Sequence, residues 1–296
     1  MSEILQMKSH RNAVILVHNY QRLEVQDIAD FTGDSLELSQ EAAKTDADVI
    51  VFCGVHFMAE TAYVINPGKT VLLPDLESGC PMANMITPEA LIARKKELPG
   101  AAVVCYVNSS AAVKAESDIC CTSANAVKVV QSLGNQEILF VPDQYLGEWV
   151  AQQAGRPMHL WNGYCPTHMK IIAEDIIRLK KEHPNALALV HPECRPDAKE
   201  AADKVMSTGG MVRFVKESSV REFIIGTETG IIHRLQKENP GKSFIPVTEK
   251  AVCPNMKRIT LEKVLWSLQD MQHRVTVPED IRVRALSAVE RMLAIG

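Results

Sequence analysis

Three cysteines in the chain are each followed by a proline: Cys80, Cys165 and Cys253. They lie 85 and 88 residues apart, so they recur with nearly one period. One such cysteine alone is most simply a buried thiol, but three in one phase indicate a shared task. Three thiolates that meet in a reducing environment can bind zinc or iron. If they held a cluster of four irons, one iron would lack a protein ligand, which favours Lewis-acid catalysis over electron transfer.

The same period recurs in polar residues that follow short apolar runs. His18, Tyr106 and His191 each end such a run, and they are 88 and 85 residues apart. A second polar group follows two residues after each of them. These partners are Tyr20, Asn108 and Glu193. Phenols and a carboxylate beside a metal centre can move protons, although each residue alone could equally be an ordinary polar group at a strand end.

A hydroxyl residue follows each run in the same phase, at Ser35, Ser123 and Thr208. All three fall where a helix is expected to begin, so one interpretation is simple N-capping by the side-chain oxygen. The other is anion binding, because free N–H groups and the helix dipole attract negative groups to a helix start. The two roles can coexist, and three converging helix starts would suit a small ligand with several carboxylates or a phosphate.

Alternating apolar and amphipathic stretches predict the elements that position these residues. In the first repeat the expected order is strand, helix, helix, strand, helix, strand and helix, over 13–17, 24–30, 35–44, 48–53, 56–65, 70–74 and from about 88. Proline with glycine or asparagine marks breaks near 98–100 and 183–185. We therefore expect three α/β repeats, over 1–98, 99–184 and 185–296, the last with two helices after about Leu261.

The repeats predict an α/β fold of three pseudo-threefold-related, three-layer α/β/α domains with parallel sheets. Continuous apolar strands are typical of sheets covered on both faces, and alternation of strands and helices implies parallel pairing. Sites on such sheets form at the carboxyl ends of the strands. Around a common axis those ends converge, so the distant cysteines and polar residues would meet in one central pocket.

The composition is that of a globular protein and excludes several classes. The chain has 296 residues, 46% of them hydrophobic, and a net charge of −4. A slightly acidic chain offers no basic field for nucleic acid or an anionic membrane. The apolar runs are short and no signal sequence is recognisable, so neither secretion nor membrane insertion is expected. We expect a cytoplasmic protein with reduced thiols.

Together the motifs resemble one known family. They are HNY at 18–20, GDS at 33–35, YVNS at 106–109, TSAN at 122–125, HPEC at 191–194, STGG at 207–210 and the three Cys-Pro segments. From about residue 10 to its end the chain resembles quinolinate synthase, the A protein of NAD biosynthesis in bacteria and archaea. The resemblance implies a pseudo-threefold of α/β domains around a [4Fe-4S] cluster, which agrees with the repeats.

The resemblance also implies a reaction. Iminosuccinate, made by L-aspartate oxidase, would condense with dihydroxyacetone phosphate to give quinolinate, phosphate and water. The partners would be these small molecules and, in a transient contact, L-aspartate oxidase.

Roles for individual residues follow from the same resemblance. Cys80, Cys165 and Cys253 would hold the cluster, and His168 would lie near it. The catalytic groups would be Tyr20, Tyr106 and Glu193. The substrate-binding residues would be His18, Ser35, Tyr106, Asn108, Ser123, His191, Glu193, Ser207 and Thr208.

Two other functions are compatible with the residues alone. A cluster-dependent hydro-lyase would dehydrate one hydroxy acid and ignore triose phosphate, and an electron-transfer protein would use the three cysteines without any substrate. The remaining cysteines carry no assigned chemistry and are most simply buried thiols, although the vicinal Cys120 and Cys121 are also compatible with redox chemistry. The five remaining cysteines are Cys53, Cys105, Cys120, Cys121 and Cys194.

Overall fold

The first repeat is built on a parallel four-stranded sheet in the computed structural model, which describes residues 1–295. Its strands lie in the order β2, β1, β3, β4, with β1 Ala13–His18 beside β3 Val49–Cys53 in the middle. The edge strands are β2 Phe31–Gly33 and β4 Thr70–Leu72. Every residue of β3 is buried, as expected for a strand that is covered on both faces.

Two further sheets repeat this arrangement. Their orders are β6, β5, β7, β8 and β10, β9, β11, β12, and all pairs within them are parallel. Their strands are β5 Ala102–Tyr106, β6 Ile119–Cys121, β7 Ile138–Val141, β8 His159–Leu160, β9 Leu187–Val190, β10 Lys204–Val205, β11 Glu222–Gly226 and β12 Ser243–Pro246. The three units predicted from the repeats are therefore confirmed as parallel α/β sheets.

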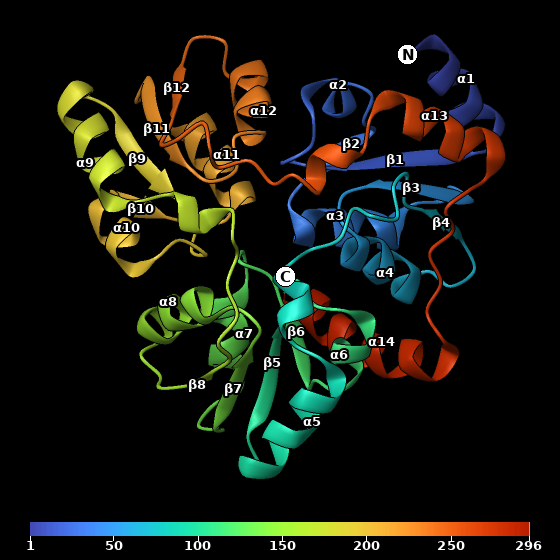
Figure 1. The fold of residues 1–296 in the computed structure, drawn as a ribbon, viewed down its shortest axis with the longest axis horizontal. Coiled ribbons are helices and arrows are strands. Elements are labelled where there is room, and N and C mark those ends of the chain that lie inside the picture. The colour runs from blue at the N-terminus through green and yellow to red at the C-terminus, as the bar shows by residue number, and fades with distance from the viewer. Residues whose placement is uncertain (296) are drawn as a thin grey trace.

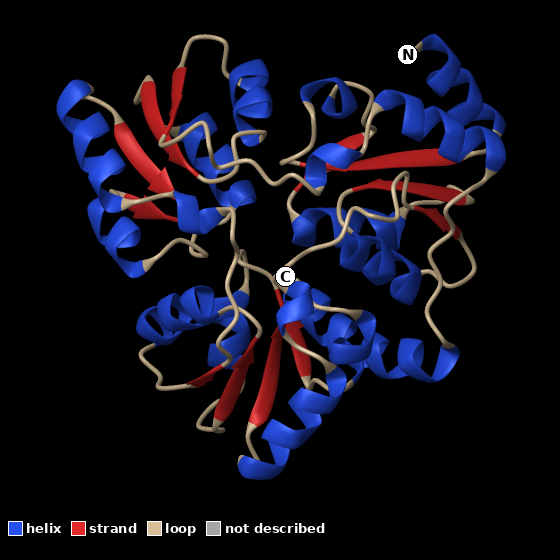
Figure 2. Cartoon of the chain, viewed as in Figure 1, coloured by secondary structure: helices blue, strands red, loops and turns tan. Residues whose placement is uncertain are grey.

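Helices cover both faces of each sheet, and the three units surround a common centre (Figures 1 and 2). The α-helices are α1 Ser2–His10, α2 Leu23–Gln26, α3 Ser35–Lys44, α4 His56–Ile65, α5 Pro88–Glu97, α6 Ala111–Ala115, α7 Ala126–Ser132, α8 Gln144–Ala154, α9 Ala173–Glu182, α10 Pro196–Ala201, α11 Thr208–Glu217, α12 Ile231–Glu238, α13 Leu261–Asp270 and α14 Glu279–Ile295. Short 3-10 turns follow the three Cys-Pro loops at η1 Ala83–Met85, η2 His168–Lys170 and η3 Met256–Arg258.

The helix after each Cys-Pro loop packs on the next unit in the ring. Helix α5 lies with the second unit, where Lys95 Nζ donates to the carbonyl of Glu116, and α9 packs on β9 and β11 of the third. Helix α13 returns to the first unit and packs on α1 and β3. Arg11 fixes this return by donating to the carbonyls of Leu268 and Gln269. The chain thus closes a ring (Figure 1).

The C-terminal helices, which the sequence groups with the third range, pack on the other two units. Besides α13 on the first unit, α14 packs on α6 and β6 of the second. The first two units and this C-terminal part share one cluster of buried apolar residues, whereas the third unit has two clusters of its own. The division into 1–98, 99–184 and 185–296 stays a prediction. Within residues 1–295, no helix combines the length and hydrophobicity that crossing a membrane requires.

Candidate active site

The carboxyl ends of the central strands meet at one cavity in the middle of the ring. Residues at or directly after the ends of β1, β5 and β9 line it, together with the three Cys-Pro loops. The volume of this cavity, including its opening to solvent, is about 630 Å³. Parallel sheets place their sites at this edge, and the ring brings three such edges together.

Twelve of the thirteen site residues predicted from the sequence line this cavity. They are His18, Tyr20, Ser35, Cys80, Tyr106, Asn108, Ser123, Cys165, His191, Glu193, Thr208 and Cys253. The thirteenth, Ser207, is buried beside Thr208, and its hydroxyl accepts the backbone N–H of Gly210 at 3.1 Å. In the part of the chain that the structure describes, Ser207 caps α11 and does not reach the cavity wall.

The cysteines of the three Cys-Pro loops are free, partly buried thiols. Burial raises the pKa of Cys80 to about 12, and it also raises the pKa of Cys165 and of Cys253. In every loop a backbone N–H three residues after the cysteine acts in the opposite direction, as a hydrogen-bond donor to the sulfur. These thiols stay protonated unless a bound cation replaces the proton, and the amides would then stabilise the thiolates.

The three sulfurs are not arranged as a compact site for a single ion in the described residues. Among residues 1–295 the three do not all lie within 4.8 Å of one another. A tetrahedral zinc with bonds of about 2.3 Å needs sulfurs about 3.8 Å apart. The described part of the chain has one closer group of possible ligands, Cys165, His168 and Glu193. The donor set is therefore compatible with an iron-sulfur cluster held by three cysteines.

Glu193 is a buried carboxylate that contacts several polar side chains of the cavity. The phenol of Tyr106 donates to Oε1 at 2.5 Å, and Nδ1 of His168 lies 2.8 Å from Oε2. Burial alone would raise the pKa of this carboxyl, but the adjacent His168, together with the hydrogen bonds from His168 and Tyr106, lowers it to about 2. Glu193 is thus ionised at neutral pH and can accept a proton.

A second chain of contacts joins Tyr20 to the same carboxylate. The hydroxyl of Thr227 bonds the phenol of Tyr20 at 2.5 Å and Nε2 of His168 at 2.9 Å. Burial raises the pKa of Tyr20 and of Tyr106 well above 10, and the charge of Glu193 raises both further. Both phenols therefore keep their protons, and Tyr20, Thr227, His168 and Glu193 form a continuous path for proton transfer across the units.

The two predicted strand-end histidines are neutral. Burial lowers the pKa of His18 and of His191 to about 3. In each, Nδ1 accepts the backbone N–H two residues later, from Tyr20 at 3.2 Å and from Glu193 at 3.3 Å. Nε2 then carries the proton, and in His191 it lies 3.1 Å from the hydroxyl of Ser123. Both rings can donate a hydrogen bond to an anionic ligand without carrying charge.

At two of the three predicted helix starts, the cap is the residue before the predicted hydroxyl. The helix start expected at Ser123 is wrong, because α7 begins three residues later at Ala126. Asp34 accepts the N–H groups of Leu36 and Glu37 and caps α3, so the hydroxyl of Ser35 is not the cap. Ser207 does the same for α11, which leaves Thr208 to face the cavity. The capping and ligand-binding interpretations thus apply to neighbouring residues.

Eight further residues line the cavity without having been predicted as site residues. They are Asp34, Val55, Phe57, Met58, Thr167, His168, Glu228 and Met256. His168 was expected near the metal site and is buried there. Asp34 belongs to the GDS motif, so its place in the hydroxyl cluster could have identified it. Glu228 follows the third strand of its unit, and the equivalent position holds Asp143 in the second unit and Val55 in the first.

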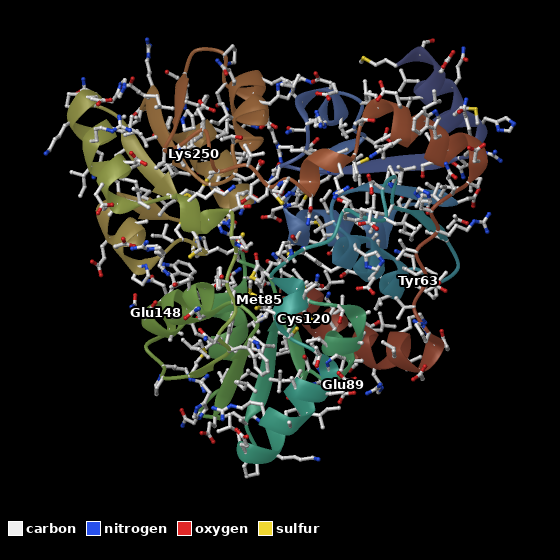
Figure 3. The ribbon with its side chains drawn as sticks, in the orientation of Figure 1. Tyr63, Met85, Glu89, Cys120, Glu148 and Lys250 are labelled. Atoms are coloured by element: carbon white, nitrogen blue, oxygen red, sulfur yellow. The ribbon has the colours of Figure 1, made fainter. Side chains whose placement is uncertain are left out.

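The other five cysteines are all buried free thiols, which agrees with their interpretation as core residues. Cys105 and Cys120 are paired in register on β5 and β6, and Cys120 lies within the second unit (Figure 3). Burial would raise the pKa of Cys105, but hydrogen bonding from Cys120 and the charge of Lys114 lower it to about 7.

Comparisons with known proteins agree with this geometry. A family model described as quinolinate synthetase A protein matches residues 2–294. The chain is 59% identical over 293 residues to a quinolinate synthase of Dehalococcoides mccartyi strain CBDB1, covering 99% of this chain and 97% of that protein. It is 57% identical over 295 residues to quinolinate synthase 1 of Methanosarcina acetivorans, covering 100% and 97%. It is 56% identical over 296 residues to a quinolinate synthase of Thermodesulfovibrio yellowstonii, covering 100% and 98%. The chain belongs to the quinolinate synthetase A protein family.

Proposed function

We propose that the chain condenses iminosuccinate with dihydroxyacetone phosphate to form quinolinate, phosphate and water in NAD biosynthesis. The observation that carries this proposal is the convergence of three cysteine loops and the Glu193 network on one cavity. Membership of the quinolinate synthetase A family supports the same product. A cytoplasmic location and a transient contact with L-aspartate oxidase, the source of iminosuccinate, belong to the proposal.

The proposed cofactor is a [4Fe-4S] cluster held by Cys80, Cys165 and Cys253. Its support is the chemistry of three soft donors that line one cavity. When bound, such a cluster has one iron without a protein ligand, and that iron supplies a Lewis acid. The backbone amides of the three loops would donate hydrogen bonds to the thiolates and so stabilise them.

Substrate anions would be held by neutral donors. His18, Ser35 and Ser123 would grip one set of oxygens. On the other side the proposed set is His191, Ser207 and Thr208, with Ser207 acting through the start of α11 that it caps. No lysine or arginine lines the cavity in the described part of the chain, so hydroxyls, imidazole N–H groups and two helix starts would carry the recognition.

Proton movement would use the two hydrogen-bonded paths to Glu193. Its carboxylate is ionised and would act as the general base, while the protonated phenols of Tyr20 and Tyr106 would return protons. Thr227 and His168 would keep Tyr20 in contact with the base. Enolisation takes a proton from carbon and delivers one to the carbonyl oxygen, whereas dehydration takes a proton from carbon and delivers one to the departing hydroxyl. Groups that transfer such protons contribute about 10²- to 10⁴-fold in rate.

The test is anaerobic purification and cluster reconstitution, followed by an assay for quinolinate. Iminosuccinate is generated enzymatically and dihydroxyacetone phosphate is added or omitted. We expect quinolinate only with both substrates, and its absence in the presence of a full cluster would refute the proposal. Turnover of one hydroxy acid without triose phosphate would favour a hydro-lyase. Cys165→Ser should abolish product, whereas the matched control Cys53→Ser, a buried thiol outside the cavity, should retain it.

A further inference from the structure

Glu228 is a fully buried carboxylate on the cavity wall whose oxygens are already occupied. Oε2 accepts the backbone N–H of Gly230 at 2.7 Å, and Oε1 accepts the backbone N–H of Cys253 at 3.1 Å. The ammonium of Lys257 lies 3.0 Å from Oε1. Because three donors occupy this carboxylate, it is poorly placed to exchange a proton with a ligand. Its contacts instead organise the backbone beside the third cysteine.

Lys257 extends this contact to the first unit. Its ammonium donates to the carbonyl of Tyr20 and lies 3.4 Å from that of Gln21. The segment that carries it crosses from β12 to α13, between the third and first units (Figure 1). One ion pair, Glu228–Lys257, therefore connects the end of β11, the loop of Cys253 and the turn that presents Tyr20.

The backbone around the ion pair is packed too closely for any side chain at Gly230. A Cβ atom there would lie 2.6 Å from Nζ of Lys257, 2.7 Å from Oε2 of Glu228 and 2.9 Å from the carbonyl carbon of Tyr20. Contacts under about 3.0 Å do not occur without displacement. The ion pair and the Tyr20 turn thus occupy one tightly filled space, which is independent support for a fixed geometry.

The position of the ion pair matters because the first and third units have separate apolar cores. Tyr20 packs against the cluster of the first unit and against one of the third unit's clusters. Its phenol bonds Thr227, the residue next to Glu228. Tyr20 is therefore held at the junction from both ends, by Thr227 at its hydroxyl and by Lys257 at its carbonyl.

We propose that Glu228 and Lys257 are positioning residues that fix the Cys253 loop relative to Tyr20. The proposal rests on the proposed function, in which Cys253 is a cluster ligand and Tyr20 a proton donor. Neither Glu228 nor Lys257 needs to touch substrate: the ion pair acts through the backbone of both residues. Loosening it should free the loop of Cys253 more than the loop of Cys80, which contacts it through the hydrogen bonds of Asn255 with Ser78 and Gly79.

The first experiment uses the chain without its cluster. Wild type, Glu228→Gln, Lys257→Met and Gly230→Ala are treated with iodoacetamide, and alkylation of Cys253 and Cys80 is followed by peptide mass spectrometry. The matched control is Lys237→Met, which removes an exposed ion pair with Asp27 that also joins the third unit to the first. We expect the Cys253/Cys80 rate ratio to rise about tenfold or more in the first three variants, as for a locally opened segment, and to stay at the wild-type value in the control.

Glu228→Gln is the decisive variant, because it removes the charge of the carboxylate and keeps the size of the side chain. A ratio in this variant within about twofold of wild type, or equal acceleration of all three loop cysteines, would overturn the proposal. This experiment needs neither cluster nor product. It therefore remains decisive if the reconstituted wild type makes no quinolinate.

The second experiment separates positioning from general destabilisation. In reconstituted enzyme Glu228→Gln should lower kcat about 10- to 100-fold, as for other residues that orient metal ligands, and leave KM almost unchanged. The midpoint potential of the cluster should also differ from that of wild type, because hydrogen bonding near a ligand sulfur tunes it. An unchanged kcat and an unchanged potential would contradict the proposal.

Discussion

Tyr106 and Glu193 are 87 residues apart in the chain, close to one repeat, and their side chains share a hydrogen bond of 2.5 Å. Tyr106 ends β5 of the second unit, and Glu193 follows β9 of the third. The bond therefore joins positions near the same edge of two neighbouring sheets. It shows directly that residues about one repeat apart in the sequence contact each other at the centre of the ring.

Replacing Tyr106 by phenylalanine tests this bond as part of the catalytic machinery. The change removes the hydroxyl donor to Glu193 and little volume. We expect kcat for quinolinate to fall about 10²-fold or more, the usual contribution of a positioned proton-transfer group. Steady-state kinetics measure this.

The control is Tyr63→Phe, a tyrosine on α4 away from the centre of the ring (Figure 3). It should leave kcat within about twofold of wild type, as for a substitution outside the site. If Tyr106→Phe behaved like this control, the bond to Glu193 would have no part in turnover.

Thr227→Val tests the link between Tyr20 and His168. Valine keeps the shape of threonine but removes the hydroxyl that bonds both partners. We expect kcat to fall about 10- to 100-fold, since the path to the base is cut while the phenol remains.

Thr227→Ser restores the hydroxyl and should recover most of the activity. Measuring kcat and KM for the two variants side by side distinguishes a broken hydrogen bond from lost packing. Equal losses in both variants would contradict a role for the hydroxyl.

The buried histidines predict how the stability of the cluster-free chain depends on pH. His18 and His191 have a folded pKa of about 3, against about 6.5 in an unfolded chain. Between these values the unfolded state binds more protons, so their contribution is fully present above pH 6.5 and is lost as pH falls towards 3. Each histidine adds up to about 1.4 kcal/mol of unfolding free energy per pH unit in this window.

Chemical denaturation of His18→Gln from pH 4 to pH 7 measures this effect. The slope of unfolding free energy against pH should be smaller than in wild type by up to about 1.4 kcal/mol per unit. His10→Gln, which changes an exposed histidine on α1, should keep the wild-type slope. A His18→Gln slope equal to that of wild type would show that burial does not keep His18 neutral.

Arg11 predicts a purely structural effect of ring closure. Its guanidinium donates to the carbonyls of Leu268 and Gln269 at 3.1 and 2.7 Å and ties α13 to the first unit. Arg11→Ala should lower the free energy of unfolding by about 1–3 kcal/mol, the range for hydrogen bonds from a charged group.

Urea denaturation compares this variant with Arg94→Ala, an exposed arginine paired with Glu97, which should change stability by less than about 1 kcal/mol. Both variants should keep wild-type kcat, because neither residue lies at the cavity. Equal stability of the two variants would mean that the contacts of Arg11 do not hold the ring closed.

Much of this architecture could be predicted from the sequence because the repeats place like residues in like positions. The long central strand of the first unit and its helices α3 and α4 agree closely with the predicted ranges. The predicted order of the first repeat does not include its edge strand β2 Phe31–Gly33. β2 has three residues and β8 and β10 have two each, so they are too short to produce a periodic pattern.

Tertiary packing explains what the sequence left open. The docking of α13 on the first unit depends on contacts with residues more than 250 positions away, such as Arg11, and no local pattern encodes it. Glu228 was missed for a related reason. It lies 85 residues after Asp143, a buried carboxylate that also comes two residues after the third strand of its unit. The first unit has Val55 at the equivalent position, so the carboxylate does not recur in all three repeats.

The central claim is that cysteines from three repeats hold one iron-sulfur cluster at the cavity. The most direct test is iron, sulfide and zinc analysis of anaerobically reconstituted wild type and of Cys80→Ser, Cys165→Ser and Cys253→Ser, with Cys53→Ser as the control. The account predicts about four irons and four sulfides per chain in wild type and control, and loss of the cluster in each of the other three variants. Stoichiometric zinc in place of iron, or an intact cluster after loss of any one of the three cysteines, would contradict it.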